Sequence, residues 1–212
     1  PEALGAWPAV VLFLAFVWME LVWERSDTPA YLAAAMLAYA AFTWLGMLLF
    51  GREQWLGRGE VFTLVFGLMA RFAPTEVRKS GSGSRALHLR PYGIGLLSRE
   101  PVPASMVVPV LAMLAAVSFD GFTETPLWAG MLEHYAPPPQ GMTSDGEAAR
   151  TWLQTAGVVG APLLFVGVYL VVCRLAAWCG GARVPVARLA ALFVLTLVPI
   201  AIAYHLAHYL SF

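Results

Sequence analysis

Two histidines near the C-terminus, His205 and His208, have the residue type and spacing best suited to chemistry. They stand in residues 188–212, a stretch otherwise apolar enough to cross a bilayer. Residues three apart on a helix project from nearly the same face, so both imidazoles are expected on one side of a membrane helix. Ionisable groups in that setting are costly and usually have polar partners. Imidazole with nearby carboxylates would suit a divalent transition metal such as zinc, iron, copper or manganese.

The elements that must position these histidines are membrane helices. Hydrophobic residues make up 59% of the 212 residues and charged residues only 12%, with a mean hydropathy of +0.70. This composition predicts an all-α, polytopic transmembrane helical bundle in a single integral membrane domain. We expect five to six membrane helices, at about residues 7–23, 29–50, 60–73, 103–119, 151–178 and 184–212.

The third of these segments is ambiguous. Residues 60–73 are hydrophobic but too few for an ordinary crossing, so they are expected either to span the membrane or to form an interfacial or re-entrant helix. Two polar connections flank the helix at 103–119. Residues 75–100 are basic and contain the Gly/Ser stretch 79–84, which predicts a weakly ordered loop. Residues 120–150 form a predicted acidic loop with three consecutive prolines, 137–139.

The distribution of positive charge favours five crossings. In that topology one side of the membrane carries all 13 Lys and Arg residues except Arg25 and Arg150. With six crossings the exceptions become Arg52, Arg58 and Arg150. Both topologies place the basic 74–102 loop in the cytoplasm, and the acidic 120–150 loop and the end of the last helix outside.

This topology brings candidate metal ligands to one level of the outer leaflet. His205 and His208 share that level with Asp120 and Glu124, and with Glu20 if there are five crossings. We predict His205, His208 and Asp120 as metal ligands, Asp120 alternatively as a partner of a ligand, and Glu124 or Glu20 as ligand or general base. A structural alternative stays open. The histidines could anchor the helix at the interface, and the carboxylates could only end or cap helices.

Several other classes of function find no support in the sequence. Zero formal net charge gives no reason to expect nucleic-acid binding. There is no HExxH, GxSxG, P-loop or CxxC motif, and no internal repeat of the kind that transporters carry. Cys173 and Cys179 are six residues apart in one apolar run and are expected to be packing residues. Glu60 is expected to form a structural ion pair with Arg58 or Arg71. The native polypeptide is expected to be longer than this chain.

Four runs of sequence together resemble a known family. They are FGREQWLGRGEVFTLVFGLMARFAP (50–74), LRPYGIGLL (89–97), SFDGFTETPLW (118–128) and LVPIAIAYHLAHYLSF (197–212). In these runs the chain is similar to bacterial polytopic membrane proteins called fenitrothion hydrolases. The resemblance spans most of the chain from about Met19 onward. It implies a multi-pass protein of the bacterial cytoplasmic (inner) membrane that hydrolyses an organophosphotriester, a reaction suited to a metal-bound hydroxide. It assigns no individual site residues.

Two functions of different classes therefore remain. The first is a membrane-embedded, metal-dependent hydrolase with its site in the outer leaflet. The alternative is a non-catalytic transmembrane subunit of a larger complex or homo-oligomer, whose apolar helices pack against partner helices or lipid. A permease for metal ions or small solutes is a weaker third reading, because repeats are absent.

Overall fold

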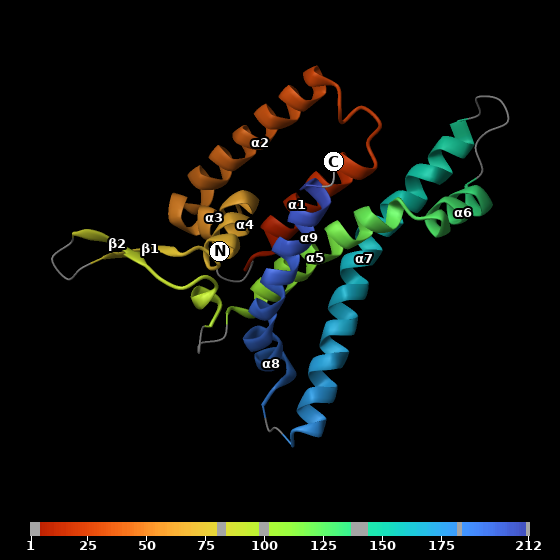
Figure 1. The fold of residues 1–212 in the computed structure, drawn as a ribbon. Helices are drawn as coiled ribbons and strands as arrows, with labels where there is room; N and C mark the ends of the chain where they lie inside the picture. The colour runs from red at the N-terminus through yellow and green to blue at the C-terminus, as the bar shows by residue number, and fades with distance from the viewer. Residues whose placement is uncertain (1–4, 80–83, 98–101, 137–143, 182–183, 211–212) are drawn as a thin grey trace.

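A computed structural model describes residues 5–79, 84–97, 102–136, 144–181 and 184–210. The predicted all-α class is confirmed (Figure 1). The helices are α1 (Trp7–Leu21), α2 (Pro29–Phe50), α3 (Arg52–Arg58), α4 (Val61–Ala70), α5 (Val107–Thr123), α6 (Pro126–Tyr135), α7 (Ser144–Cys179), α8 (Val186–Phe193) and α9 (Val198–Leu210). Three short 3₁₀ segments add to them: η2 (Ile94–Leu96), η3 (Ala104–Met106) and η4 (Val194–Leu197). Two strands, β1 (Thr75–Lys79) and β2 (Arg85–Leu89), form an antiparallel hairpin.

Four helical stretches among these residues are long and apolar enough to cross a membrane. They are Pro29–Phe50, Ala104–Thr123, Gly146–Cys179 and Val186–Tyr204. The chain is therefore a multi-pass membrane protein. Helix α1 is apolar but has 15 residues. Helix α4 has 10 residues, so it is about 15 Å long, half the thickness of a bilayer core.

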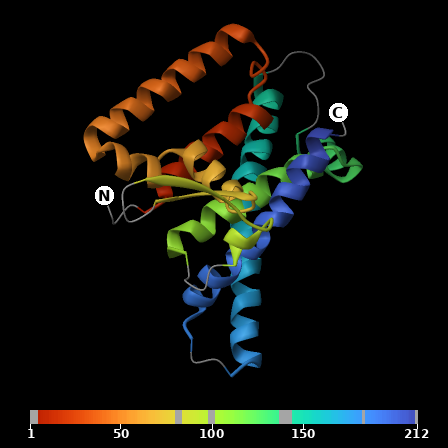
Figure 2. The same ribbon diagram turned by 60° about the vertical axis from the view of Figure 1, so that its left-hand side comes forward.

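Helix α5 is the centre of the bundle. Its side chains Val110, Leu111, Ala112 and Ala115 are at most 1% exposed, and α1, α7 and α9 all pack on it. Helices α1 and α5 run in the same direction: the first turns of both line one small apolar pocket, and the last turns of both line another. Figures 1 and 2 show α9 running in the same general direction and α7 in the opposite one. The C-terminal ends of α1, α5 and α9 therefore lie on one side.

The connection after α5 differs from the predicted loop at residues 120–150. Helix α5 continues to Thr123, α6 follows at once, and α7 begins at Ser144. The Thr125 side chain caps α6 by accepting a hydrogen bond from the Trp128 backbone N–H. The Trp128 ring then packs edge-on against Phe119, with centroids 5.3 Å apart. This aromatic contact folds α6 back onto α5, so Asp120 lies in the last turns of a helix and not in a loop.

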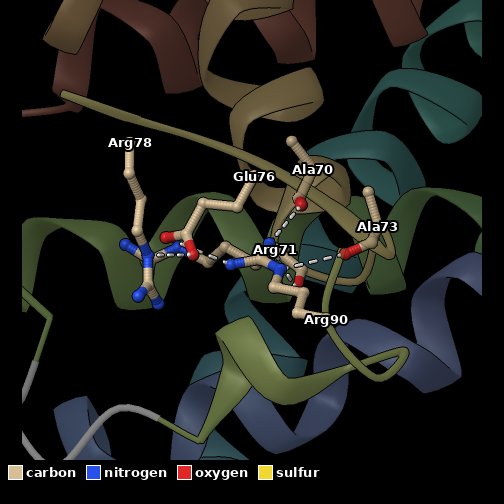
Figure 3. A network of polar contacts seen from close by, with 6 residues as sticks. All are labelled: Ala70, Arg71, Ala73, Glu76, Arg78 and Arg90. Atoms are coloured by element: carbon tan, nitrogen blue, oxygen red, sulfur yellow. Dashed lines mark hydrogen bonds and ion pairs between the residues drawn. The ribbon is translucent and has the colours of Figure 1, made fainter. Parts of the chain in front are cut away.

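The basic segment after α4 also differs from prediction. A weakly ordered loop was expected at residues 75–100, but β1 and β2 pair from Thr75 opposite Leu89 to Lys79 opposite Arg85. Figure 3 shows what anchors this hairpin. The Arg90 guanidinium donates to the carbonyls of Ala70 and Ala73 at 3.0 and 3.1 Å, where α4 ends. It also contacts the Glu76 carboxylate at 3.5 Å. A cation at these unsatisfied carbonyls is favourable, and it ties the hairpin to α4.

The last apolar run is interrupted by a 3₁₀ segment. Residues 184–212 were expected as a single crossing, and Val186–Tyr204 is one helical stretch long enough to cross a membrane, in which η4 separates α8 from α9. Pro199 explains the break, because it has no N–H to donate to the carbonyl of Leu195 and its ring crowds that carbonyl. The tighter hydrogen bonding of the 3₁₀ segment η4 accommodates this local loss of α-helical hydrogen bonding.

Gly157 gives a sharp test of the α5–α7 interface. A Cβ atom at this position would lie 2.2 Å from Cζ of Phe119, whose ring is buried. Gly157→Ala should therefore lower the free energy of unfolding by about 1–3 kcal/mol through overpacking. The measurement is the melting temperature of purified protein in one detergent. Gly160→Ala is the matched control, since nothing lies within 4 Å of its added Cβ. Equal melting temperatures for the two variants would contradict this packing.

Candidate functional site

Two of the predicted carboxylates line one cavity. Glu20 of α1 and Asp120 of α5 both border a cavity of about 170 Å³ near the C-terminal ends of these helices. The parallel packing of α1 on α5 produces this arrangement, because both residues lie in the last turns of their helices. The rest of the lining is apolar and includes Phe13, Phe16 and Val17. The cavity exceeds the roughly 10–15 Å³ that one water molecule requires.

The two histidines are carried by α9, which packs along α5. The predicted helix at these two positions is confirmed, since both lie within α9. The side chains of His205 and His208 lie outside the described part of the structure. Ala201, one turn before His205, is 2% exposed, whereas Ala203, Tyr204, Leu206, Ala207 and Leu210 are exposed, so the bundle covers one face of α9 up to about Ala201. Among the side chains that are described, no cluster of three His, Cys, Asp or Glu residues occurs.

Glu124 is separated from the other two carboxylates. It follows the last residue of α5, its side chain is exposed, and it does not line the cavity of Glu20 and Asp120. Thr123, one residue before Glu124, donates its hydroxyl to the carbonyl of Asp120 at 2.7 Å. That bond helps to close the end of α5.

Glu60 forms a buried polar contact that the sequence did not indicate. Its side chain is 6% exposed and caps α4 by accepting the backbone N–H groups of Phe62 and Thr63. The Tyr39 hydroxyl of α2 donates to the same carboxylate. The predicted ion pair of Glu60 with Arg58 or Arg71 is wrong for the described residues, whose ion pairs join Glu76 to Arg78 and Arg90.

This contact decides the charge state of Glu60. Burial raises the pKa of the carboxyl, but the hydrogen bonds from Thr63, Tyr39 and the backbone outweigh burial and hold the pKa below its ordinary value. A carboxylate whose oxygens are occupied by a helix N-terminus and a tyrosine is suited to joining α2 to α4. It is poorly placed to act as a general base, which would need a free oxygen.

A larger cavity of about 680 Å³ separates α1 from α2. Its lining is almost entirely apolar and includes Leu12, Phe16, Met36 and Phe42, with Tyr39 beside them. Helix α2 has one buried residue, Gly46. It is held mainly where it meets α3, through Trp55 stacked on Phe50 at 5.6 Å. In a bilayer this space offers an apolar surface to lipid or to another helix.

Comparison with protein-family models, with curated proteins and with solved structures finds no match for this chain.

Proposed function

We propose that this multi-pass membrane protein binds a divalent transition metal ion at the outer end of α5. Asp120, His205 and His208 are the ligands, and Glu20 is a further ligand or the general base. The observation that carries the proposal is the shared cavity of Glu20 and Asp120, two carboxylates that are 100 residues apart in the sequence. Two carboxylates that line one small cavity with otherwise apolar walls supply oxygen ligands of the kind that a divalent cation binds.

The direction of the helices supports placing the histidines at the same site. Helices α5 and α9 run in the same general direction and pack together. Asp120 and the histidines all lie toward the C-terminal ends of their helices. Asp120 would thus meet an imidazole pair across the α5–α9 contact. The distribution of Lys and Arg supports an orientation with this end of the bundle on the outer face of a bacterial cytoplasmic membrane.

The reaction class we propose is hydrolysis of an organophosphotriester. A divalent metal acidifies bound water and polarises a phosphoryl oxygen. Glu20 would accept the proton of the attacking water, since it shares the cavity with Asp120, whereas Glu124 lies outside it. The aryl or alkoxy group would leave as phosphorus gains the new oxygen. This activity rests on the family resemblance of residues 118–128 and 197–212, and the metal site rests on the geometry.

Metal analysis of the purified protein tests the site. We expect about one zinc, iron, copper or manganese ion per chain in wild type, and loss of most of it in His205→Ala and His208→Ala. The chain has four histidines, so His88→Ala and His134→Ala are matched controls that should keep the metal. His88 lies on β2 and His134 on α6, and both are exposed. Unchanged metal content in the His205 and His208 variants would contradict the proposed metal site.

A non-catalytic subunit of a larger complex is the second candidate function. It is favoured by helix α2, most of whose residues are exposed. Within the span Pro29–Phe50 only 6% of the residues are buried inside the protein, and Met36, Leu37 and Leu48 are at least 66% exposed. A partner helix could cover this face. Native mass measurement after gentle detergent extraction separates the two functions: an assembly with other membrane proteins, without metal, would favour the subunit.

A further inference from the structure

The β1–β2 hairpin has an uncovered apolar face. In an antiparallel pair, residues directly opposite each other project from the same face. Val77 pairs with Leu87, and Leu89 lies two residues further on the same face. These three side chains are 62%, 70% and 84% exposed. Exposing three adjacent apolar side chains to water is unfavourable, which indicates that another surface covers them.

A basic pair of positions, Lys79 and Arg85, ends this apolar face of the hairpin. The paired strands contain Arg78, Lys79, Arg85 and one acidic residue, Glu76. Lys79 pairs with Arg85 at the tip, in the same register as Val77 with Leu87. The Glu76 carboxylate is occupied within the protein, by Arg78 at 3.0 Å and Arg90 at 3.5 Å. The net charge that the hairpin presents outward is therefore positive.

The hairpin is held in a fixed place relative to the membrane helices. Arg90 fastens it to the end of α4 (Figure 3), and the backbone N–H of Arg90 bonds the carbonyl of Pro74 at 2.7 Å. The chain returns so closely that a Cβ on Gly95 would lie 2.5 Å from the carbonyl oxygen of Arg71. Figures 1 and 2 both show the hairpin extending sideways from the bundle, across the direction of α9.

We propose that this hairpin lies on the surface of the membrane that the chain spans and binds anionic lipid headgroups. Val77, Leu87 and Leu89 insert at the level where headgroups meet acyl chains, and Arg85, which belongs to the same face of the hairpin, binds lipid phosphate. An apolar face with basic residues beside it is the pattern of interfacial membrane elements. The hairpin follows α3 and α4 in the connection between the apolar stretches Pro29–Phe50 and Ala104–Thr123, so it belongs at a membrane face, where lipid is always at high effective concentration. This proposal does not depend on the metal site.

Fluorescent labels on the two faces of the hairpin test the proposal. Leu87→Cys and Ala86→Cys, each in a Cys179→Ser background, place an environment-sensitive dye on opposite faces of one strand. Cys173 is buried, so protein without a hairpin cysteine serves as the blank. The labelled protein is placed in nanodiscs of phosphatidylcholine, with or without phosphatidylglycerol, and with spin-labelled lipid as quencher. We expect strong quenching and a blue shift at residue 87 in the anionic discs, and neither at residue 86.

The charge contribution is tested separately with Arg85→Gln, and Arg78→Gln on the opposite face is the matched control. Arg85→Gln should weaken the insertion equilibrium in anionic discs by roughly fivefold and leave it nearly unchanged in neutral discs, whereas Arg78→Gln should change it little in either. Both side chains are exposed, so the fold should persist. Equal quenching at residues 86 and 87, or none at either, would overturn the proposal. Protection of residue 87 only when another protein is added would overturn it too, in favour of a protein partner.

Discussion

Asp120→Asn should lose its divalent metal and, with it, hydrolysis of an aryl phosphotriester. Asparagine keeps the size of the side chain but removes the negative charge that a cation needs. Replacing even an indirect partner of a metal ligand typically weakens affinity about 10- to 100-fold, and a direct ligand should cost at least as much. Metal content and the rate of release of a nitrophenol leaving group are the two measurements.

The control for Asp120 is Glu133→Gln. Glu133 is an exposed carboxylate of α6 and should keep both metal and rate at wild-type levels. Glu20→Gln should keep much of the metal but lose rate if Glu20 is the base, and Glu124→Gln should affect the rate less. Retention of metal and rate in Asp120→Asn would refute the site, whereas loss of rate only in Glu124→Gln would move the base out of the cavity.

Glu60→Ala should destabilise the protein by about 2–4 kcal/mol. Removing the cap of α4 costs about 1 kcal/mol, and leaving the Tyr39 hydroxyl without its acceptor costs about 1–3 kcal/mol more. Thermal unfolding in a single detergent measures the effect. Glu53→Ala is the control, because Glu53 is an exposed carboxylate in the first turn of α3 and should contribute less than about 1 kcal/mol. Similar melting temperatures for the two variants would show that the Tyr39–Glu60 contact contributes little.

The same carboxylate gives the stability a pH dependence. The native pKa of Glu60 is below the ordinary value of 4.5, so folding favours the ionised form. Its contribution is therefore fully present above pH 4.5 and is lost as the pH falls through the lower native pKa. Wild type should lose more stability than Glu60→Gln across this acidic range. Parallel losses in the two proteins would show that other groups control the acid response.

The ends of α2 could be predicted because its signals are local. Pro29 suits the first turn of a helix, and Gly51 follows the last residue with φ +84°. The start of α7 could not be predicted from hydropathy, because its first turns, from Ser144, are polar and stand beyond the apolar run. The hairpin was missed for a related reason. Its Gly/Ser-rich tip dominates the composition, and the alternation of Val77, Leu87 and Leu89 matters only once the strands pair.

The depth of the candidate site in the membrane could be predicted from the sequence, but the helix faces that meet there could not. Charge counting placed Glu20 and Asp120 at one depth only for the topology with five crossings, and their shared cavity depends on which faces of α1 and α5 meet. A hydropathy pattern that is apolar all round carries no such information. The Tyr39–Glu60 contact joins residues 21 apart on two different helices. Its only sequence signal is a glutamate directly before an apolar helix, which is also the signal of a helix cap.

The sparse packing of α2 has a consequence for how the protein responds to membrane thickness. With 22 residues the helix is about 33 Å long, slightly more than an average bilayer core. A helix held mainly at one end sets its tilt by matching its length to the surrounding lipid. A thinner bilayer should tilt α2 further and so change the width of the cavity between α1 and α2. The Tyr39 hydroxyl would then move relative to Glu60, so the chain length of the lipids should change the stability of the α2–α4 contact.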